Sequence, residues 1–171
     1  NPGCYPTSII LALKPLIYSN LIENNSRIII DAKSGTTGAG RKPSEATHFC
    51  EVNESFKAYN IHKHRHEPEI FQELNVNNEN PVKGTFTPHL LPMLRGILST
   101  IHTETKGNST QEDIYNCLNK FYEKEKFVRV YPIGKLPETK YVNGTPYCDI
   151  GFSLMDNNLI LVSCIDNLLK G

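Results

Sequence analysis

The chain has 171 residues, and its 18 basic side chains balance its 18 acidic ones. This length is enough for one domain with a hydrophobic core. A net charge of zero is atypical of nucleic-acid-binding proteins, which usually carry a basic excess. No apolar segment approaches the roughly 20 residues that a membrane-spanning helix needs. Composition therefore predicts a single globular domain that contacts neither nucleic acid nor membrane.

In chain order, the first half of the sequence alternates between helical and extended patterns. Apolar spacing predicts an amphipathic helix over residues 6–20, which Pro15 is expected to bend or end. The β-branched residues at 27–33 then predict a buried strand. The following segments are predicted as a glycine- and hydroxyl-rich loop (34–42), an extended stretch (55–66) and a short helix (67–75).

The second half is richer in strand patterns. Residues 108–125 show the clearest helical periodicity, with Ser109 or Thr110 as the N-cap. Strand-like runs occur at 82–90, 95–106, 127–132, 147–155 and 159–166. A short DNN turn joins the last two runs and predicts a hairpin. We therefore predict an α+β domain with a mixed, mainly antiparallel sheet that is covered by helices.

The five cysteines are an odd number without a C-x-x-C pair. This pattern predicts a reduced, cytoplasmic protein rather than a disulfide-bonded one. Cys117, Cys148 and Cys164 lie in apolar patterns and are predicted to be small buried hydrophobic residues. For Cys50 the sequence favours neither a buried nor a functional role.

The sequence NPGCYPT places a thiol where the first helix is expected to begin. A helix N-terminus presents unpaired N–H groups and about half a positive charge, which lower the pKa of a nearby thiol from its usual ~8.5. The same N–H groups can bind the oxyanion that forms when a thiolate attacks a carbonyl. Cys4 is therefore a candidate nucleophile. The alternative is a buried cysteine that happens to precede a helix.

Three histidines alternate in the stretch IHKHRHEPEI. If this stretch is extended, His62, His64 and His66 face the same way. Histidine exchanges protons near neutral pH, and Glu69 could orient an imidazole from the start of the next helix. The pattern favours acid–base chemistry and leaves two alternatives open, a zinc site and a set of surface histidines.

Two further segments have the chemistry of anion sites. The loop SGTTGAGRK offers N–H groups and hydroxyls and ends in Arg41 and Lys42, which suits phosphate, although most loops of this composition only connect strands. Arg95 precedes an expected strand and is suited to bind a carboxylate through two hydrogen bonds. Without further context, an ordinary surface ion pair is the favoured interpretation of Arg95.

Six motifs occur in one order along the chain: NPGCYPT, DAKSGTTGAGRK, HRHEPEI, FTPHLLPMLRGI, YCDIGF and DNLLKG. In this combination the chain closely resembles the N-acetyl-gamma-glutamyl-phosphate reductase family over essentially its whole length. The resemblance implies the catalytic and oligomerising domain of a two-domain enzyme, similar to the aspartate-semialdehyde and glyceraldehyde-phosphate dehydrogenases. It also implies the reaction, in which NADPH reduces N-acetyl-gamma-glutamyl phosphate to the semialdehyde and phosphate in arginine biosynthesis.

The resemblance also implies roles for individual residues. Cys4 matches the nucleophile that forms a thioester, and His64 matches the acid–base residue. His66 and Glu69 match positions that support the active site, whereas His62 lies outside the family pattern. No residue is implied to bind a metal. The implied substrate-binding residues are Ser34, Gly35, Thr36, Thr37, Lys42 and Arg95, and Asn167 is implied to approach the nicotinamide.

The chain departs from the family pattern in its extent. Family members carry a Rossmann NADP-binding domain before NPGC, and residues 1–171 contain no G-x-G-x-x-G fingerprint. We therefore expect one domain of a longer, cytoplasmic protein that binds NADP poorly by itself. The resemblance implies a homodimer or homotetramer. Two rival hypotheses are a cofactor-free Cys/His hydrolase or acyltransferase and a metal-binding domain built on the three alternating histidines.

Overall fold

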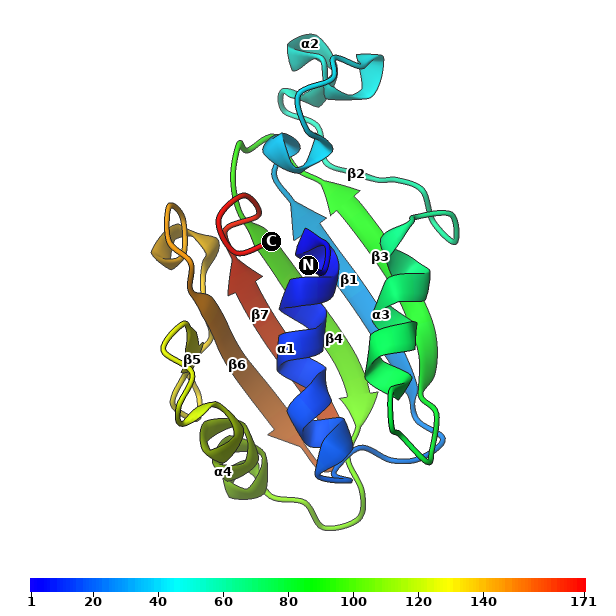
Figure 1. Ribbon diagram of the computed structural model, residues 1–171, viewed down its shortest axis with the longest axis vertical. Coiled ribbons are helices and arrows are strands. Elements are labelled where there is room, and N and C mark those ends of the chain that lie inside the picture. Colours follow the sequence, from blue (N-terminus) through cyan, green and yellow to red (C-terminus); the bar gives the residue numbers. More distant parts are fainter.

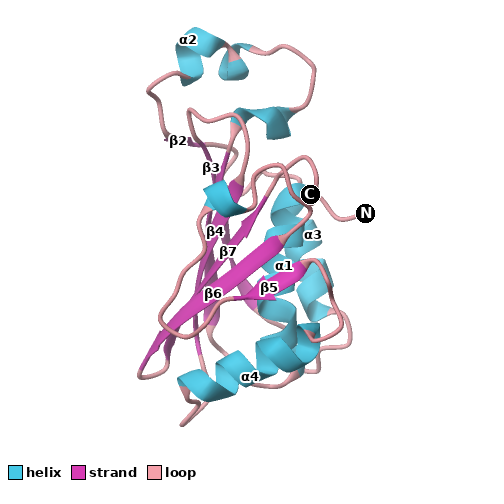
Figure 2. Cartoon of the chain, turned by 90° about the vertical axis from the view of Figure 1, so that its left-hand side faces the viewer, coloured by secondary structure: helices cyan, strands magenta, loops and turns pink.

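The computed structural model describes all residues from 1 to 171. Its α-helices are α1 (Cys4–Tyr18), α2 (Phe49–Val52), α3 (His66–Asn75) and α4 (Gln111–Tyr122). Its strands are β1 (Arg27–Ser34), β2 (Lys57–Ala58), β3 (Lys83–Leu90), β4 (Ile97–Glu104), β5 (Val128–Val130), β6 (Cys148–Met155) and β7 (Asn158–Ile165). The strands form one sheet, and α1, α3 and α4 lie together on one of its faces (Figure 1, Figure 2).

The sheet has seven strands in the order β2-β3-β1-β4-β7-β6-β5. The pairs β1–β3 and β5–β6 are parallel, and the other neighbouring pairs are antiparallel. Strands β6 and β7 form the predicted hairpin, with Met155 opposite Asn158. The predicted α+β domain with a mixed, mainly antiparallel sheet is confirmed.

The hydrophobic core lies between the sheet and the helices. Alternate residues of the central strands point to this side, where Ile97, Ile101 and Leu161 are completely buried. From α1, Ile9 and Leu13 are buried against them. Burial of an aliphatic side chain of this size contributes about 1.5–3 kcal/mol. The packing therefore anchors α1 along its length and fixes the position of its first residue relative to the sheet.

Pro15 does not end α1. The helix continues to Tyr18 with Pro15 inside it. Leu16 and Ile17 are both buried. Their burial compensates for the hydrogen bond that a proline cannot make.

The extended conformation predicted for residues 55–66 is wrong over most of that stretch. Only its short β2 portion pairs with the sheet, as an edge strand beside β3. The chain then turns, with His62 in the left-handed region at φ 56°, and α3 begins at His66. Because the backbone turns, His62, His64 and His66 do not share one face of a strand.

Helices cover one face of the sheet only (Figure 2). On the other face, Val142 from the segment before β6 packs against Val162 and Cys164. Ile29 and Met155 on this face remain 43% and 74% exposed. The predicted helical cover is thus confirmed for a single face, and an apolar part of the second face is open.

Residues 40–56 form an arm that projects beyond the end of the sheet and carries α2 (Figure 1, Figure 2). Cys50 lies exposed on this arm. Cys148 and Cys164 are buried, as predicted, whereas Cys117 is only partly buried and donates its S–H to Oγ of Ser19 at 3.2 Å. None of the helices combines the length and the apolar character needed to cross a bilayer.

Candidate active site

Cys4 is the first residue of α1, and Gly3 caps the helix with an extended backbone. Burial is the strongest influence on the Cys4 thiol and raises its pKa, while the N–H groups of Tyr5 and Cys4 and the charge of Arg65 lower it. The net direction is upward. The lowered pKa that the sequence predicted is therefore wrong for this chain, because desolvation outweighs the helix N-terminus.

Gly3 connects the start of α1 to the start of α3. Its N–H donates a hydrogen bond of 2.9 Å to Oε1 of Glu69. A β-carbon on Gly3 would lie 2.3 Å from Nε2 of His66, so the imidazole fills the place of a side chain. Only glycine permits this approach. His66 and Glu69 thus both contact the residue that precedes the thiol.

His64 is half-buried among aromatic rings. Its ring centroid lies 5.5 Å from that of Tyr5, 5.5 Å from that of Tyr59 and 5.4 Å from that of Phe86, each in an edge-to-face arrangement. The N–H of His66 donates to Nδ1 of His64 at 3.2 Å. In the neutral ring the remaining proton is then on Nε2, which is left as a hydrogen-bond donor.

Both imidazoles rest in the neutral form. Burial, followed by the charges of His66 and Arg65, lowers the pKa of His64 to about 4. Burial and then Arg65 also lower the pKa of His66, against the opposite effect of Glu69. With the thiol pKa raised, Cys4 and His64 therefore form no thiolate–imidazolium pair at neutral pH. Deprotonation of Cys4 has to accompany its attack.

His62 does not join the other two histidines. Its side chain is 68% exposed, and its Nδ1 lies 3.9 Å from Oε1 of Glu67. No three histidine, cysteine, aspartate or glutamate side chains converge in a geometry that could hold a metal ion. The structure thus lacks the three-histidine cluster on which the metal-binding hypothesis depends.

The loop after β1 is tied to the segment that precedes β4. The N–H groups of Gly35 and Thr36 and the hydroxyl of Thr37 donate hydrogen bonds to carbonyl oxygens of residues 93–96. The Thr36 hydroxyl donates to this segment as well. Most of the polar groups that made this loop a candidate anion site are therefore occupied within the protein.

Asn167 reinforces the same connection. Its Oδ1 accepts a hydrogen bond of 2.8 Å from the N–H of Gly96, and its Nδ2 donates to Oγ1 of Thr37 at 3.0 Å. The residue is buried, with 4% exposure. These contacts give Asn167 a part in holding the loop, and they occupy both ends of the carboxamide that was predicted to approach the nicotinamide.

The two predicted anion-binding cations, Lys42 and Arg95, do not line the cleft that contains the thiol. Lys42 is exposed on the arm. Nη1 of Arg95 donates to Oδ2 of the buried Asp166 at 3.1 Å. The geometry of this chain therefore gives no support to a substrate contact by either residue.

The thiol opens into a cleft of about 400 Å³. Of the predicted residues, those that line it are Cys4, Ser34, Gly35, His64 and His66. The predicted residues outside its lining are Glu69, Thr36, Thr37, Lys42, Arg95 and Asn167. The other lining residues were not predicted, and among them are Tyr5, Lys57, Tyr59 and Arg65.

The sequence nevertheless contained a signal for two of the missed residues. Tyr5 lies inside the NPGCYPT motif, and Arg65 lies between the two histidines of HRH. An extended HRH segment would have pointed Arg65 away from its neighbours. The observed turn places all three side chains of the motif along the cleft.

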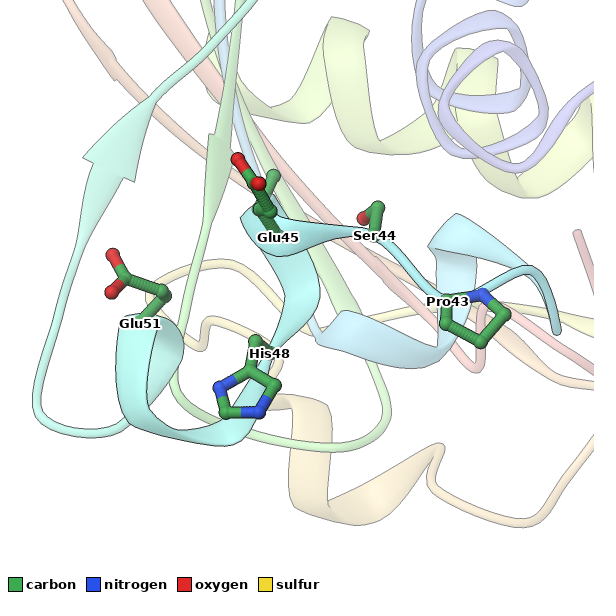
Figure 3. Close-up of a pocket in the computed structure, with 6 residues that line it drawn as sticks. Pro43, Ser44, Glu45, His48 and Glu51 are labelled. Atoms are coloured by element: carbon green, nitrogen blue, oxygen red, sulfur yellow. The ribbon is translucent and has the colours of Figure 1, made fainter.

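A wider hollow of about 790 Å³ lies on the arm. Figure 3 shows its lining, in which Glu45 comes from the 3-10 helix Glu45–Thr47, Glu51 comes from α2 and His48 lies between these two helices. It shares Ser44 and Ala46 with the cleft but contains neither the thiol nor a neutral imidazole of the HRH motif. The smaller cleft, which has the nucleophile, is therefore the candidate active site.

A family model described as semialdehyde dehydrogenase, dimerisation domain, matches residues 4–167. The chain belongs to this family. This agrees with the resemblance of the six sequence motifs to the N-acetyl-gamma-glutamyl-phosphate reductases, a family similar to the aspartate-semialdehyde dehydrogenases.

Curated relatives of this semialdehyde dehydrogenase dimerisation domain have a more specific name. The chain is 53% identical to an N-acetyl-gamma-glutamyl-phosphate reductase from Desulforapulum autotrophicum, and the match covers 100% of this chain and 50% of the relative. A reductase of the same name from Alkaliphilus metalliredigens is 54% identical, again over 100% of this chain and 50% of the relative. The chain thus spans about half the length of the curated relatives it matches.

Solved structures resemble the domain in fold. Aspartate semialdehyde dehydrogenase II from Vibrio cholerae superposes with a TM-score of 0.75 at 17% identity, covering 100% of this chain and 57% of that one. The same enzyme complexed with ASA gives a TM-score of 0.74 at 18% identity, with the same coverage. The α+β fold is therefore shared with the semialdehyde dehydrogenases.

Proposed function

We propose that the intact protein carrying this domain reduces N-acetyl-gamma-glutamyl phosphate with NADPH to N-acetylglutamate semialdehyde and phosphate, in arginine biosynthesis. Residues 1–171 are its catalytic and oligomerising domain. The observation that carries the proposal is the place of Cys4, at the head of α1 in a cleft lined by two imidazoles. This arrangement occurs in a chain that is 50–54% identical to reductases of that name.

In the first half-reaction the sulfur of Cys4 attacks the carbonyl carbon of the acyl phosphate. The S–C bond forms, the C–O bond to phosphate breaks, and the thiol proton ends on the departing phosphate. The N–H groups of Cys4 and Tyr5, which already face the sulfur, are positioned to stabilise the oxyanion of the tetrahedral intermediate. The product on the enzyme is a Cys4 thioester.

NADPH supplies the hydride that reduces the thioester. Residues 1–171 contain no G-x-G-x-x-G fingerprint, and the Asn167 carboxamide is hydrogen-bonded within the protein at both ends. We therefore assign NADP to a Rossmann domain outside residues 1–171. In this chain, Nε2–H of His64 donates a hydrogen bond to the substrate oxygen, and Gly3, His66 and Glu69 keep the thiol in position.

The reverse reaction tests this function directly. The intact protein is mixed with N-acetylglutamate semialdehyde and NADP, with and without phosphate or arsenate, and the absorbance of the reduced cofactor is followed. We expect sustained reduction that requires the oxyanion and disappears in Cys4→Ala. Sustained reduction without an oxyanion indicates a water-terminated aldehyde dehydrogenase. Thioester hydrolysis without any dinucleotide instead favours the cofactor-free hydrolase.

We also propose that the domain forms a homodimer or homotetramer through the uncovered face of its sheet. Ile29, His102 and Ile160 lie in one row across three neighbouring strands on this face, and Ile29 is 43% exposed. Light scattering should show a smaller assembly for Ile29→Glu than for the unchanged protein, and an unchanged mass contradicts this surface.

The five free cysteines favour a reducing compartment, which supports the cytoplasm as the location of the protein.

A further inference from the structure

The charged side chains that line the active-site cleft are all positive. Two of its lining residues are cations, Lys57 and Arg65, and none is an aspartate or a glutamate. The imidazoles in the lining are neutral, as their lowered pKa values require. A cleft lined by two cationic side chains and no carboxylate is suited to a ligand with two anionic groups.

Arg65 lines the cleft together with Cys4 and the two imidazoles. It directly precedes α3, between His64 and the His66 ring that fills the space beside Gly3. Its guanidinium forms neither an ion pair nor a hydrogen bond within the protein. Its charge nevertheless reaches the thiol, since it lowers the pKa of Cys4. Arg65 is exposed and lines the same cleft as Cys4, so its guanidinium is a free, forked hydrogen-bond donor in that cleft.

Lys57 belongs to another part of the cleft. It lies on the edge strand β2, opposite Leu90 of β3, where the arm meets the sheet. Lys57 is partly exposed, and like Arg65 it forms no ion pair within the protein. Its ammonium is therefore available to a ligand in the cleft.

We propose that Arg65 and Lys57 are the anion-binding pair of the cleft, with Arg65 receiving the phosphate that leaves as Cys4 attacks and Lys57 receiving a carboxylate at the far end of the substrate. The proposal rests on the proposed function. An N-acetylglutamyl phosphate has its acyl phosphate next to the attacked carbon and its carboxylate at the opposite end of the carbon chain. The two cations of the cleft lie on different elements and offer one partner for each anionic group, and the forked guanidinium suits phosphate.

This pair takes the place of the cations that the family resemblance implied. Arg95 is engaged by Asp166, and Lys42 is outside the cleft. Arg65 also acts on the leaving group. As the C–O bond breaks, negative charge grows on the phosphate oxygens, and a guanidinium placed there stabilises the transition state more than the ground state.

The first test measures phosphate binding without turnover. The intact protein is alkylated with iodoacetamide at fixed pH while inorganic phosphate is titrated, and modification of the Cys4 peptide is followed by mass spectrometry. Phosphate should protect Cys4. In Arg65→Gln, the phosphate concentration that gives half protection should rise roughly tenfold or more, the effect of losing a charge-assisted contact. Lys57→Gln and the neighbouring exposed control Lys63→Gln should protect like the unchanged protein.

The second test separates the two cations in the phosphate-dependent oxidation of the aldehyde. Arg65→Gln should raise KM for phosphate, and Lys57→Gln should raise KM for the semialdehyde with little change in KM for phosphate. Equal losses in Arg65→Gln and Lys63→Gln overturn the proposal, because they indicate a general field rather than a site. Phosphate protection lost in Arg65→Gln in a protein without reductase activity refutes the function but not the anion site. Retained reductase activity with an unchanged KM for phosphate in Arg65→Gln refutes the anion site but not the proposed function.

Discussion

The imidazole of His66 occupies the space beside Gly3, so that a β-carbon on Gly3 would lie 2.3 Å from its Nε2. We expect Gly3→Ala to displace the buried ring and to lower the free energy of unfolding by about 1–3 kcal/mol. Denaturant titration of the intact protein measures this. In a His66→Ala background the same change should cost much less, because the ring is gone. Equal costs in both backgrounds argue against the contact.

The rate at which Cys4 is alkylated should reflect the raised pKa of its thiol. Since burial keeps the thiol protonated, its alkylation by iodoacetamide should keep increasing as pH rises beyond about 8.5, the usual thiol value. Peptide-resolved mass spectrometry separates Cys4 from the exposed Cys50, which serves as the internal comparison. A rate for Cys4 that levels off below neutral pH would show that the helix N-terminus prevails after all.

Stability should fall in mild acid because of His64. Its pKa is about 4 in the folded protein, below the ~6.5 of an unfolded chain. Between these values the unfolded chain binds a proton that the folded protein does not, so the free energy of unfolding decreases as pH falls through this window. Denaturant titrations at several pH values from 7 to 4 should show a weaker decrease for His64→Gln. An identical pH dependence in the two proteins contradicts the neutral, buried state of His64.

Asn167 should be more important for stability than its partner Thr37. Asn167→Ala leaves the buried N–H of Gly96 without an acceptor, a loss of about 1–3 kcal/mol, and it also removes the contact to Thr37. Thr37→Val affects only the second contact and one exposed carbonyl hydrogen bond. Thermal or denaturant unfolding of both variants checks the order. If Thr37→Val costs as much as Asn167→Ala, the Gly96 hydrogen bond is not the stabilising element.

The elements of this domain follow closely from the sequence wherever a periodic apolar pattern is long. The α4 helix starts after Thr110, whose hydroxyl accepts from the N–H of Asp113 while the Asp113 carboxylate accepts from the N–H of Thr110. Such a capping box depends only on local residues and is therefore readable in advance. The β6–β7 hairpin was readable for the same reason.

The cleft was less predictable because it depends on contacts between distant segments. Gly3 meets Glu69, and Asn167 meets Thr37, and no local pattern specifies such pairs. The direction of the Cys4 pKa shift also required the structure, because the extent of burial is a tertiary property. The turn at His62 is the third case, since alternating polar residues resemble a strand whether or not a neighbouring strand is present.

The central claim is that Cys4 carries the acyl group of the substrate. The most direct measurement supplies the intact protein with N-acetylglutamate semialdehyde and NADP in the absence of phosphate, followed by intact-mass and peptide analysis after rapid acid quenching. The account predicts a mass increase equal to one N-acetylglutamyl group, located on the Cys4 peptide, labile to hydroxylamine and absent in Cys4→Ala. Reduction of NADP without a bound acyl group, or with the group on another residue, would contradict it.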